Sequence, residues 1–306
     1  MKGRILEILR KQSEVVSGEV LSARLGVSRV SIWKHLQKLQ ACGYRIESSP
    51  KGYRLLEEPD SLLPWEFPGW EGRIHYYEEL SSTMDVARQM ARDGCEPFTV
   101  VIAERQTRGR GRLQRTWVSQ NGGIYFTIVL RPPLPPQLGF RVNFAASAVL
   151  ARVLRRRYDL DARVKWPNDI LIEGRKLCGL LAEMEAEGDQ VSFVNVGMGI
   201  NVNNDPPQVE SGAVSLRQVL GREISRRNLL ADFLGELETR VDGRRLEEAV
   251  GEWRGYAATL NRRVRVVTAR ESLEGRAVDV DDTGALILET DDGVRQRVIY
   301  GDCFLA

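Results

Sequence analysis

The sequence predicts a multidomain α+β chain: a winged helix-turn-helix at the N-terminus, a mixed-sheet α/β body and a small C-terminal β-barrel. First, 306 residues are more than one ordinary core needs. Second, residues 1–56 carry 11 Lys and Arg against 4 Asp and Glu, whereas the remaining 250 carry 33 against 38. Third, helical spacing of apolar residues gives way to short alternating strands after Arg263. We therefore expect domains at 1–60, 66–260 and 261–306.

The head, residues 1–56, has a net charge of +7 and the rest a net charge of −5, so we expect the head to meet nucleic acid. Ser17 and Ser28 are candidate N-caps of two helices separated by Gly26, which is typical of a helix-turn-helix. The expected DNA-binding segment is Ser17 to Leu36. Its last helix, 28–41, should bury Val30, Trp33, Leu36 and Leu39 and present Arg29, Ser31, Lys34, His35 and Lys38 to DNA.

Two strands, 44–47 and 52–55, would form the wing, with Lys51 near its tip and able to reach a phosphate. A protein-interaction module of the same fold is the alternative for this head. The positive charge weighs against that alternative.

Composition excludes several classes of protein. The four cysteines form no C-x-x-C pair, and there are only two histidines, His35 and His75. These numbers argue against a disulfide framework, a zinc site and a Ser-His-Asp triad. Charged residues interrupt the apolar residues at the N-terminus, so we expect no signal peptide, and no apolar run reaches the roughly 18 residues needed to span a membrane. The expected location is the cytoplasm.

The body alternates strands and helices. Expected strands are 74–77, 99–104, 124–130, 163–166, 170–172, 177–184 and 191–196. Expected helices are 86–92, 137–158, 229–241 and 246–256. Four short strands, 264–268, 274–280, 286–289 and 295–299, should form the C-terminal barrel. The loop from Arg105 to Gly123 carries five arginines between Arg105 and Arg115, and we expect an anion to order it.

Glycine and cations occur together in two stretches of the body. The first is Gln106-Thr107-Arg108-Gly109-Arg110-Gly111-Arg112, running on to Trp117. The second is Lys165-Trp166-Pro167-Asn168-Asp169, followed by Arg175-Lys176-Leu177-Cys178-Gly179. Glycine lets backbone N–H groups approach an anion, and Arg or Lys neutralises its charge. Ser82 and Thr83 stand at a helix N-terminus, where a polar ligand group can bind, although such residues are often simple caps.

In this order, the two stretches resemble the signature of biotin protein ligases, and the resemblance covers nearly the whole chain. The head is similar to that of the bifunctional members, which also repress the biotin operon. The resemblance implies a central domain like that of class II aminoacyl-tRNA synthetases and an SH3-like C-terminal domain. It also implies ATP-dependent formation of biotinyl-5'-AMP and transfer of biotin to a lysine of a biotin carboxyl carrier protein.

Site residues follow from the same resemblance. The implied catalytic residues are Lys176, Arg112 and Asp169, with Asp169 also a candidate ligand of the Mg²⁺ that accompanies ATP. The implied biotin-binding residues are Ser82, Thr83, Met84, Gln106, Arg110, Gly111, Arg112, Lys176 and Gly179. The implied nucleotide-binding residues are Gly109, Arg110, Arg112, Trp117, Asn168, Lys176 and Asn201. The chain departs from the family pattern in having Met84 for Asn, Gln114 for Gly, and Ala306 at an end that often carries Arg.

The implied partners are operator DNA, the carrier protein and a second copy of the chain, in a dimer promoted by the adenylate. Asp169 could accept the proton of the attacking lysine, hold Mg²⁺ or orient Asn168. Two alternatives are a lipoate ligase, which would lack both the head and the Gly-Arg loop, and a non-catalytic sensor, which would not need Arg112, Lys176 and Asn168 together.

Overall fold

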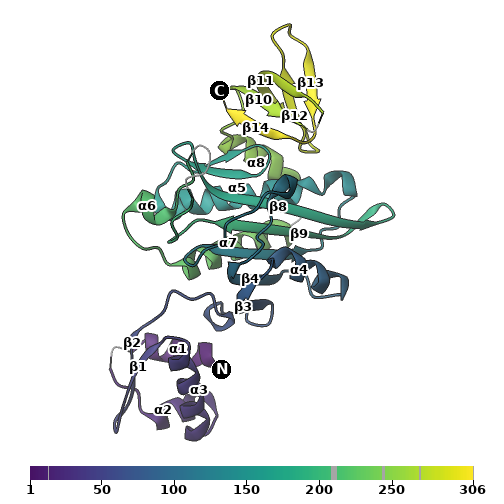
Figure 1. Cartoon of the computed structure of the whole chain (residues 1–306). Coiled ribbons are helices and arrows are strands. Elements are labelled where there is room, and N and C mark those ends of the chain that lie inside the picture. Colours follow the sequence, from purple (N-terminus) through teal and green to yellow (C-terminus); the bar gives the residue numbers. More distant parts are fainter. Residues whose placement is uncertain (13, 208–211, 243–244, 269, 306) are drawn as a thin grey trace. The chain divides into compact units, whose positions relative to one another are not determined.

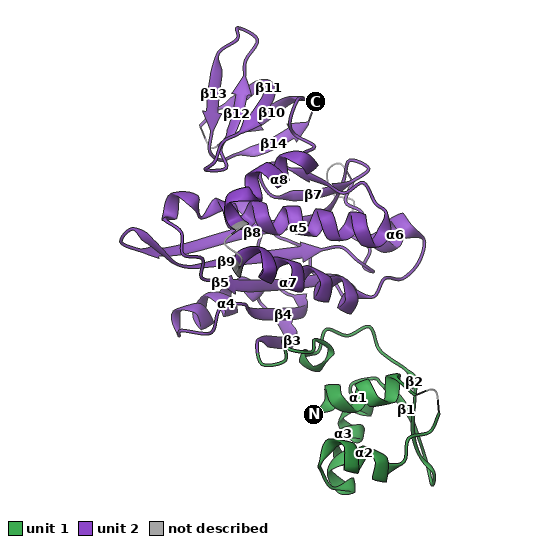
Figure 2. Ribbon diagram, turned by 180° about the vertical axis from the view of Figure 1, so that it is seen from behind, with its two compact units in different colours: residues 1–72 green, residues 73–306 purple. Residues whose placement is uncertain are grey.

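We describe the chain from a computed structural model, which covers residues 1–306 except 13, 208–211, 243–244, 269 and 306. It separates into two compact units, Met1–Gly72 and Arg73–Ala306, coloured green and purple in Figure 2. No helix in the described part of the chain is long and apolar enough to cross a membrane.

The first unit is a three-helix core with a β-hairpin. Its elements are α1 (Lys2–Arg10), α2 (Gly18–Leu25), α3 (Arg29–Ala41), β1 (Arg45–Ser49) and β2 (Gly52–Glu57). Ser17 and Ser28 cap α2 and α3 as expected, each accepting a hydrogen bond from a backbone N–H, and Gly26 ends α2 in the left-handed conformation. The wing and helix-turn-helix predictions are confirmed.

The buried face of α3 differs from the expected one. Ile32, Leu36 and Leu39 are buried, whereas Val30 is 63% and Trp33 51% exposed. The expectation that Val30 and Trp33 point inward was therefore wrong. Apolar residues occur on two stripes of this helix, and packing against α1 and α2 selects the stripe that contains Ile32.

The first unit extends past the wing because Glu66 is tied to its core. Arg10 donates to the Glu66 carboxylate at 2.7 Å, and the Tyr44 hydroxyl also bonds to Glu66. Lys2 lies 3.8 Å from the centroid of the Trp65 ring. Residues 64–66 form a short 3-10 helix on this anchor.

A seven-stranded mixed sheet forms the centre of the second unit (Figure 1). Its order is β3-β4-β5-β9-β8-β7-β6, and only the β3–β4 pair is parallel. The strands are β3 (Ile74–Leu80), β4 (Thr99–Gln106), β5 (Ile124–Leu130), β6 (Arg163–Lys165), β7 (Asp169–Ile172), β8 (Arg175–Glu187) and β9 (Gln190–Ile200).

Helices cover both faces of this sheet. On one face, α4 (Thr83–Arg92) packs Ala87 and Ala91 against Val101, Val129 and Phe193. The opposite face holds Phe126, whose ring contacts Phe233 of α7 (Arg226–Asp242). The remaining helices are α5 (Phe140–Tyr158), α6 (Leu216–Leu220) and α8 (Ala249–Tyr256). The helix expected from residue 137 begins at Phe140, after a short 3-10 turn, and α6 was not expected.

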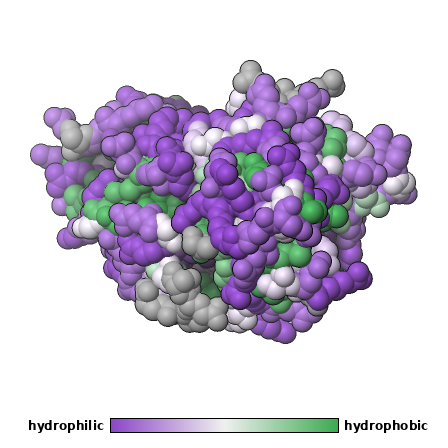
Figure 3. Space-filling model, turned by 90° about the horizontal axis from the view of Figure 1, so that it is seen from above, coloured by the Kyte–Doolittle hydropathy of each residue, from purple (hydrophilic) through white to green (hydrophobic). Residues whose placement is uncertain are grey.

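The C-terminal domain is a five-stranded antiparallel sheet in the order β13-β12-β11-β10-β14. Its strands are β10 (Arg263–Val267), β11 (Ser272–Val280), β12 (Leu286–Glu289), β13 (Arg295–Val298) and β14 (Asp302–Leu305). The SH3-like prediction is confirmed, with β14 as an additional strand. In the view of Figure 3 the surface is mostly hydrophilic, and hydrophobic residues form separate patches.

Candidate active site and DNA-binding surface

Three glycines leave one face of the β8–β9 pair flat. Gly179 lies opposite Gly199, and Gly197 lies two residues before Gly199 on β9, on the same face of the sheet. A Cβ atom on Gly199 would lie 2.2 Å from Trp117 Nε1, and one on Gly179 would lie 2.9 Å from the same indole. Trp117 therefore lies directly on this glycine floor. Its Nε1 is buried and has no hydrogen-bond partner among the described residues.

The N-terminus of α4 lies beside this floor. Ser82 occupies the N-cap position, but its side chain makes no cap hydrogen bond, and its buried Oγ has no described partner. Thr83, by contrast, has protein partners: its backbone N–H donates to Gln106 Oε1 at 2.8 Å, and its hydroxyl accepts from Thr127 at 2.8 Å. Gln106 in turn donates to Ser119 Oγ at 2.8 Å. Predicted biotin-binding residues from β4 and α4 are thus brought together.

Met84 forms an apolar wall in this region. It is 3% exposed, and a Cβ atom on Gly197 would lie 2.5 Å from its sulfur. A thioether is only a weak acceptor, so a polar ligand gains little hydrogen bonding here.

The Gly-Arg loop forms an irregular hairpin, with bridges between Gln106 and Ser119 and between Arg110 and Thr116. A Cβ atom on Gly109 would lie 2.3 Å from Trp117 O, so only glycine fits there. Arg110 forms ion pairs with Asp85 at 2.9 Å and with Glu183 at 2.5 Å. In this conformation, carboxylates of α4 and β8 neutralise that arginine.

Arg112 points toward the start of β7. Its Nη1 donates to Gly301 O at 3.1 Å and, more weakly, to Asn168 Oδ1 at 3.4 Å. Burial lowers the pKa of Arg112, whereas the charges of Asp302 and Asp169 raise it. The guanidinium stays charged at neutral pH, and its partial desolvation strengthens its attraction for an anion.

Lys176 and Asp169 meet at the β7–β8 pair. Lys176 Nζ lies 2.7 Å from Asp169 Oδ1, a charge contact without the geometry of a hydrogen bond. The same ammonium lies 5.4 Å from the centroid of the Trp117 ring. Lys176 is half-buried rather than fully buried, with 38% of its side chain exposed. The two stretches singled out in the sequence therefore converge on one indole.

The other predicted contacts serve the scaffold as well. Asn168 Nδ2 donates to Leu180 O at 2.5 Å, and Asn201 Oδ1 accepts from Asn204 at 2.9 Å. Gly111 N donates to Arg115 O at 2.8 Å and closes a turn of the loop. The two asparagine bonds hold Asn168 and Asn201, both predicted to bind nucleotide, beside the start of β7 and the end of β9.

Cysteine chemistry is unfavourable beside the site. Burial raises the pKa of the Cys178 thiol well above its ordinary value, and burial raises that of Cys303 to about 11. Both thiols are protonated near neutral pH, so neither is a ready nucleophile.

Among the described residues, no group of three or more His, Cys, Asp or Glu side chains is arranged so that it could hold a metal ion. Asp169 is the carboxylate of the predicted set. Mg²⁺ usually binds through one or two carboxylates together with substrate phosphates. Asp169 therefore fits a role as one carboxylate ligand of a Mg²⁺ ion that would arrive with ATP.

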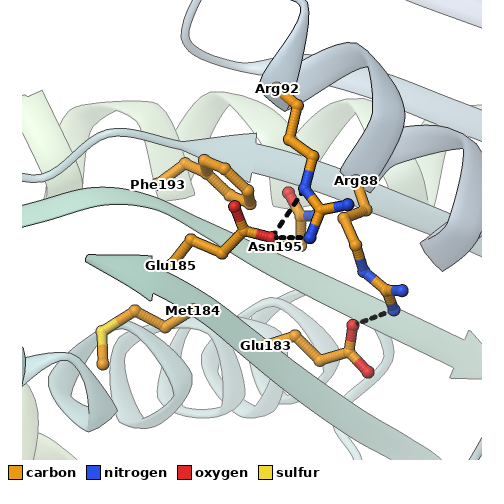
Figure 4. A pocket seen from close by; sticks show the side chains of 7 residues that line it. All are labelled: Arg88, Arg92, Glu183, Met184, Glu185, Phe193 and Asn195. Carbon is orange, nitrogen blue, oxygen red and sulfur yellow. Dashed lines mark hydrogen bonds and ion pairs between the residues drawn. The ribbon is translucent and has the colours of Figure 1, made fainter. Parts of the chain in front are cut away.

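Sequence reasoning missed a pocket next to the glycine floor. A cavity of about 310 Å³ lies between α4 and the β8–β9 hairpin (Figure 4). Arg88 pairs with Glu183 and Arg92 with Glu185 at its rim. Asn195 at its base is fully buried, and both polar atoms of its amide lack described partners. No pattern in the apolar strand 191–196 marked Asn195.

The first unit offers a basic surface on α3 and the wing. Lys34, Lys38 and Lys51 are exposed there, and Arg29 forms a long ion pair of 3.5 Å with Glu19. Ser31 is half-buried. His35 is half-buried too, and burial, followed by the positive N-terminus and Lys2, lowers its pKa, so it adds no positive charge at neutral pH.

These features define a class of protein: an α/β body with cations around a glycine floor, preceded by a helix-turn-helix. Residues 76–202 match the biotin/lipoate A/B protein ligase family, residues 3–54 an HTH domain, and residues 259–306 the biotin protein ligase C-terminal domain.

Similarity to known proteins shows more closely which members of this class the chain resembles. The chain is 35% identical to the bifunctional ligase/repressor BirA of Bacillus subtilis, covering 93% of this chain and 92% of that protein. It is 30% identical to BirA of Escherichia coli, covering 92% and 91%. The biotin protein ligase of Aquifex aeolicus, solved with biotin and ATP, superposes with a TM-score of 0.63 and 25% identity over 76% of this chain and 98% of that one. The chain belongs to the biotin protein ligase family, in the bifunctional branch that combines biotin ligation with a DNA-binding repressor head.

Proposed function

We propose that the second unit forms biotinyl-5'-AMP from biotin and ATP. The observation that carries this proposal is the glycine floor, where Ser82 Oγ and Trp117 Nε1 are buried without described partners between α4 and two loop cations. A buried polar group without a partner costs about 1–3 kcal/mol, which a polar ligand can recover.

In this proposal Ser82, Thr83 and Gln106 bind the polar ring of biotin, and Met84 and Gly197 form the apolar wall. Lys176 and Arg112 hold the biotin carboxylate and the α-phosphate together, lowering their mutual repulsion and stabilising charge that develops at phosphorus. Pyrophosphate leaves as the carboxylate oxygen bonds to phosphorus. Mg²⁺ would arrive with ATP and offset phosphate charge.

We propose that a lysine amine of a biotin carboxyl carrier protein then attacks the acyl carbon of the adenylate, so that an amide forms and AMP leaves. The amine must lose a proton to attack, and Asp169 is the candidate acceptor once Lys176 turns toward the phosphate. The thiols of Cys178 and Cys303 have raised pKa values, which supports direct transfer without a covalent enzyme intermediate.

The adenylate is also our proposed corepressor for biotin synthesis genes, acting in the cytoplasm where DNA is present. Two half-sites require two heads and hence a dimer. β8 lies between β9 and β7 in the sheet, but β7 pairs with it only over residues 175–179. From residue 180 onward, no described strand pairs with the edge of β8 that faces away from β9. Arg110 of the loop contacts Glu183 on this free part of β8. A loop ordered by adenylate therefore lies beside an edge that a second copy could pair with.

The ligase half is tested by Lys176→Ala. Because Lys176 pairs with Asp169 and lies beside the Trp117 ring, pyrophosphate release from ATP with biotin should fall by about 10²–10³-fold while the fold persists. Arg175→Ala is the matched control, since Arg175 is adjacent and pairs with Glu173 at 2.6 Å. Near-normal release by Lys176→Ala would contradict the assignment, and equal turnover of lipoate would favour the lipoate ligase alternative.

The dimer half is tested by sedimentation of the full chain with and without biotin plus ATP. Positive coupling predicts a stronger association with both ligands present. An association constant that is the same with and without biotin plus ATP would rule out this coupling.

A further inference from the structure

Two arginines of the Gly-Arg loop end on one short segment of the C-terminal domain. Arg112 donates to the carbonyl of Gly301 at 3.1 Å, and Arg115 forms an ion pair with the carboxylate of Asp302. Arg112 also reaches Asn168 in the predicted nucleotide site. The C-terminal domain therefore touches the loop at residues on both sides of a single turn.

This segment is fixed within its own domain. Asp302 pairs with Val267 in the β10–β14 ladder. Gly301 has φ +147°, and a Cβ atom there would lie 2.6 Å from Val266 and 3.0 Å from the Val267 carbonyl oxygen. The Gly301 carbonyl and the Asp302 carboxylate are thus presented by a rigid edge rather than by a free terminus.

The loop, in contrast, is poorly suited to hold its own shape. Leu113 and Gln114 are consecutive residues with φ of 51° and 58°, a left-handed conformation that L side chains seldom adopt. Leu113 is 59% exposed, so packing does little to compensate. Two backbone bonds, Gly111 N to Arg115 O and Arg115 N to Arg112 O, close the turn. The contacts of Arg112 and Arg115 with the C-terminal domain stabilise this strained turn from outside.

We propose that Gly301 and Asp302 are positioning residues for the Gly-Arg loop. They hold residues 111–115 closed at the nucleotide site, so that the C-terminal domain governs how long the adenylate is retained. This inference rests on the proposed adenylate chemistry and assigns the retention of its product to a particular contact.

The test uses Asp302→Asn in the full chain, which keeps the size of the side chain and removes its charge. With biotin and ATP but no acceptor protein, pyrophosphate should appear as one rapid burst per site followed by slow release limited by leakage. Asp302→Asn should leave the burst within about twofold and accelerate the slow phase at least threefold, on the order expected for loss of one partly exposed ion pair. Trypsin should also cleave the ligand-free loop faster.

Matched variants separate positioning from general damage. Asp291→Asn removes an ion pair with Arg263 in the same domain, away from the loop, and should leave the slow phase unchanged. Arg115→Gln removes the same contact from the loop side and should reproduce the leak even if Asp302→Asn folds poorly. The double variant should leak no faster than either single variant, because both remove one contact.

An unchanged slow phase in Arg115→Gln and Asp302→Asn, or additive effects of the two, would overturn the inference. Failure of the unaltered protein to produce any pyrophosphate burst would instead contradict the proposed function. The two failures are therefore distinguishable.

Discussion

Ser82 has a buried hydroxyl with no described hydrogen-bond partner, although it occupies the N-cap position of α4. Most buried hydroxyls are satisfied, and one that is not usually has a ligand or water to bind. Ser82, Trp117 and Asn195 each have a buried polar side-chain atom without a described partner, and all three lie on or beside one face of the β8–β9 pair. Buried polar atoms without partners therefore indicate the position of the ligand site more precisely than the volume of the neighbouring cavity does.

Ser82→Ala should separate binding from stability. The variant should bind biotin about tenfold more weakly, corresponding to one lost hydrogen bond to ligand, while its melting temperature stays equal or rises because an unpaired buried group is removed. Calorimetric titration with biotin and a thermal unfolding curve measure the two effects. Ser147→Ala is the control, since the buried Ser147 hydroxyl already donates to Phe144 O at 3.0 Å.

If Ser82→Ala instead lost stability and kept its affinity for biotin, Ser82 would be an ordinary structural cap. The Ser147→Ala control should show that pattern.

At the scale of elements, β8 and β9 shape the site because they carry glycine, which has no side chain, where other residues lie against the sheet. Gly179, Gly197 and Gly199 allow Met84 and Trp117 to lie against the strands. This close approach is the structural reason for glycine at positions that otherwise weaken a strand.

Gly199→Ala should displace the indole of Trp117, because its Cβ would lie 2.2 Å from Nε1. Overpacking of this kind costs about 1–3 kcal/mol, so ATP binding should weaken by about tenfold or more. Gly251→Ala in α8 is the control: a Cβ atom there meets nothing within 4 Å. Normal ATP affinity in Gly199→Ala would show that the position of Trp117 on the floor is unimportant.

We predict that two exposed lysines of helix α3 contact the DNA phosphates. Lys34→Ala and Lys38→Ala should each weaken operator binding and reduce the slope of log affinity against log salt by about 0.9, since each lysine would release phosphate counterions. Fluorescence anisotropy at several salt concentrations measures the slope. Lys11→Ala is the control, because Lys11 is the C-cap residue of α1, outside α3 and the wing, and pairs with Glu7 at 2.7 Å. Unchanged slopes in both α3 variants would place the DNA elsewhere.

Elements were predictable where one pattern dominated. Ser17, Gly26 and Ser28 mark the ends of α2 and α3 through local hydrogen bonds that need no tertiary context. The inward face of α3 was not predictable, because apolar residues at both Val30 and Ile32 fit a helical stripe. The strand β14 has only four residues and no alternation strong enough to signal it.

At the scale of the whole molecule, the family signature predicted which residues gather, but not what holds them. Lys176, Asp169 and Trp117 come together as expected. The contact between Arg115 and Asp302 joins residues 187 positions apart, and the pair of Arg110 with Glu183 joins residues 73 apart. Contacts at such separations depend on packing of the complete chain, which local spacing does not encode.

In the proposed function, the adenylate made in the second unit controls DNA binding by the first. The most direct measurement of this control is the affinity of the full chain for a DNA fragment preceding biotin synthesis genes, with and without biotin plus ATP. We predict that the two ligands together tighten binding at least tenfold, a coupling of about 1.4 kcal/mol or more, and that Lys176→Ala shows no such gain. Equal affinity in both conditions, or an equal gain in Lys176→Ala, would contradict this account.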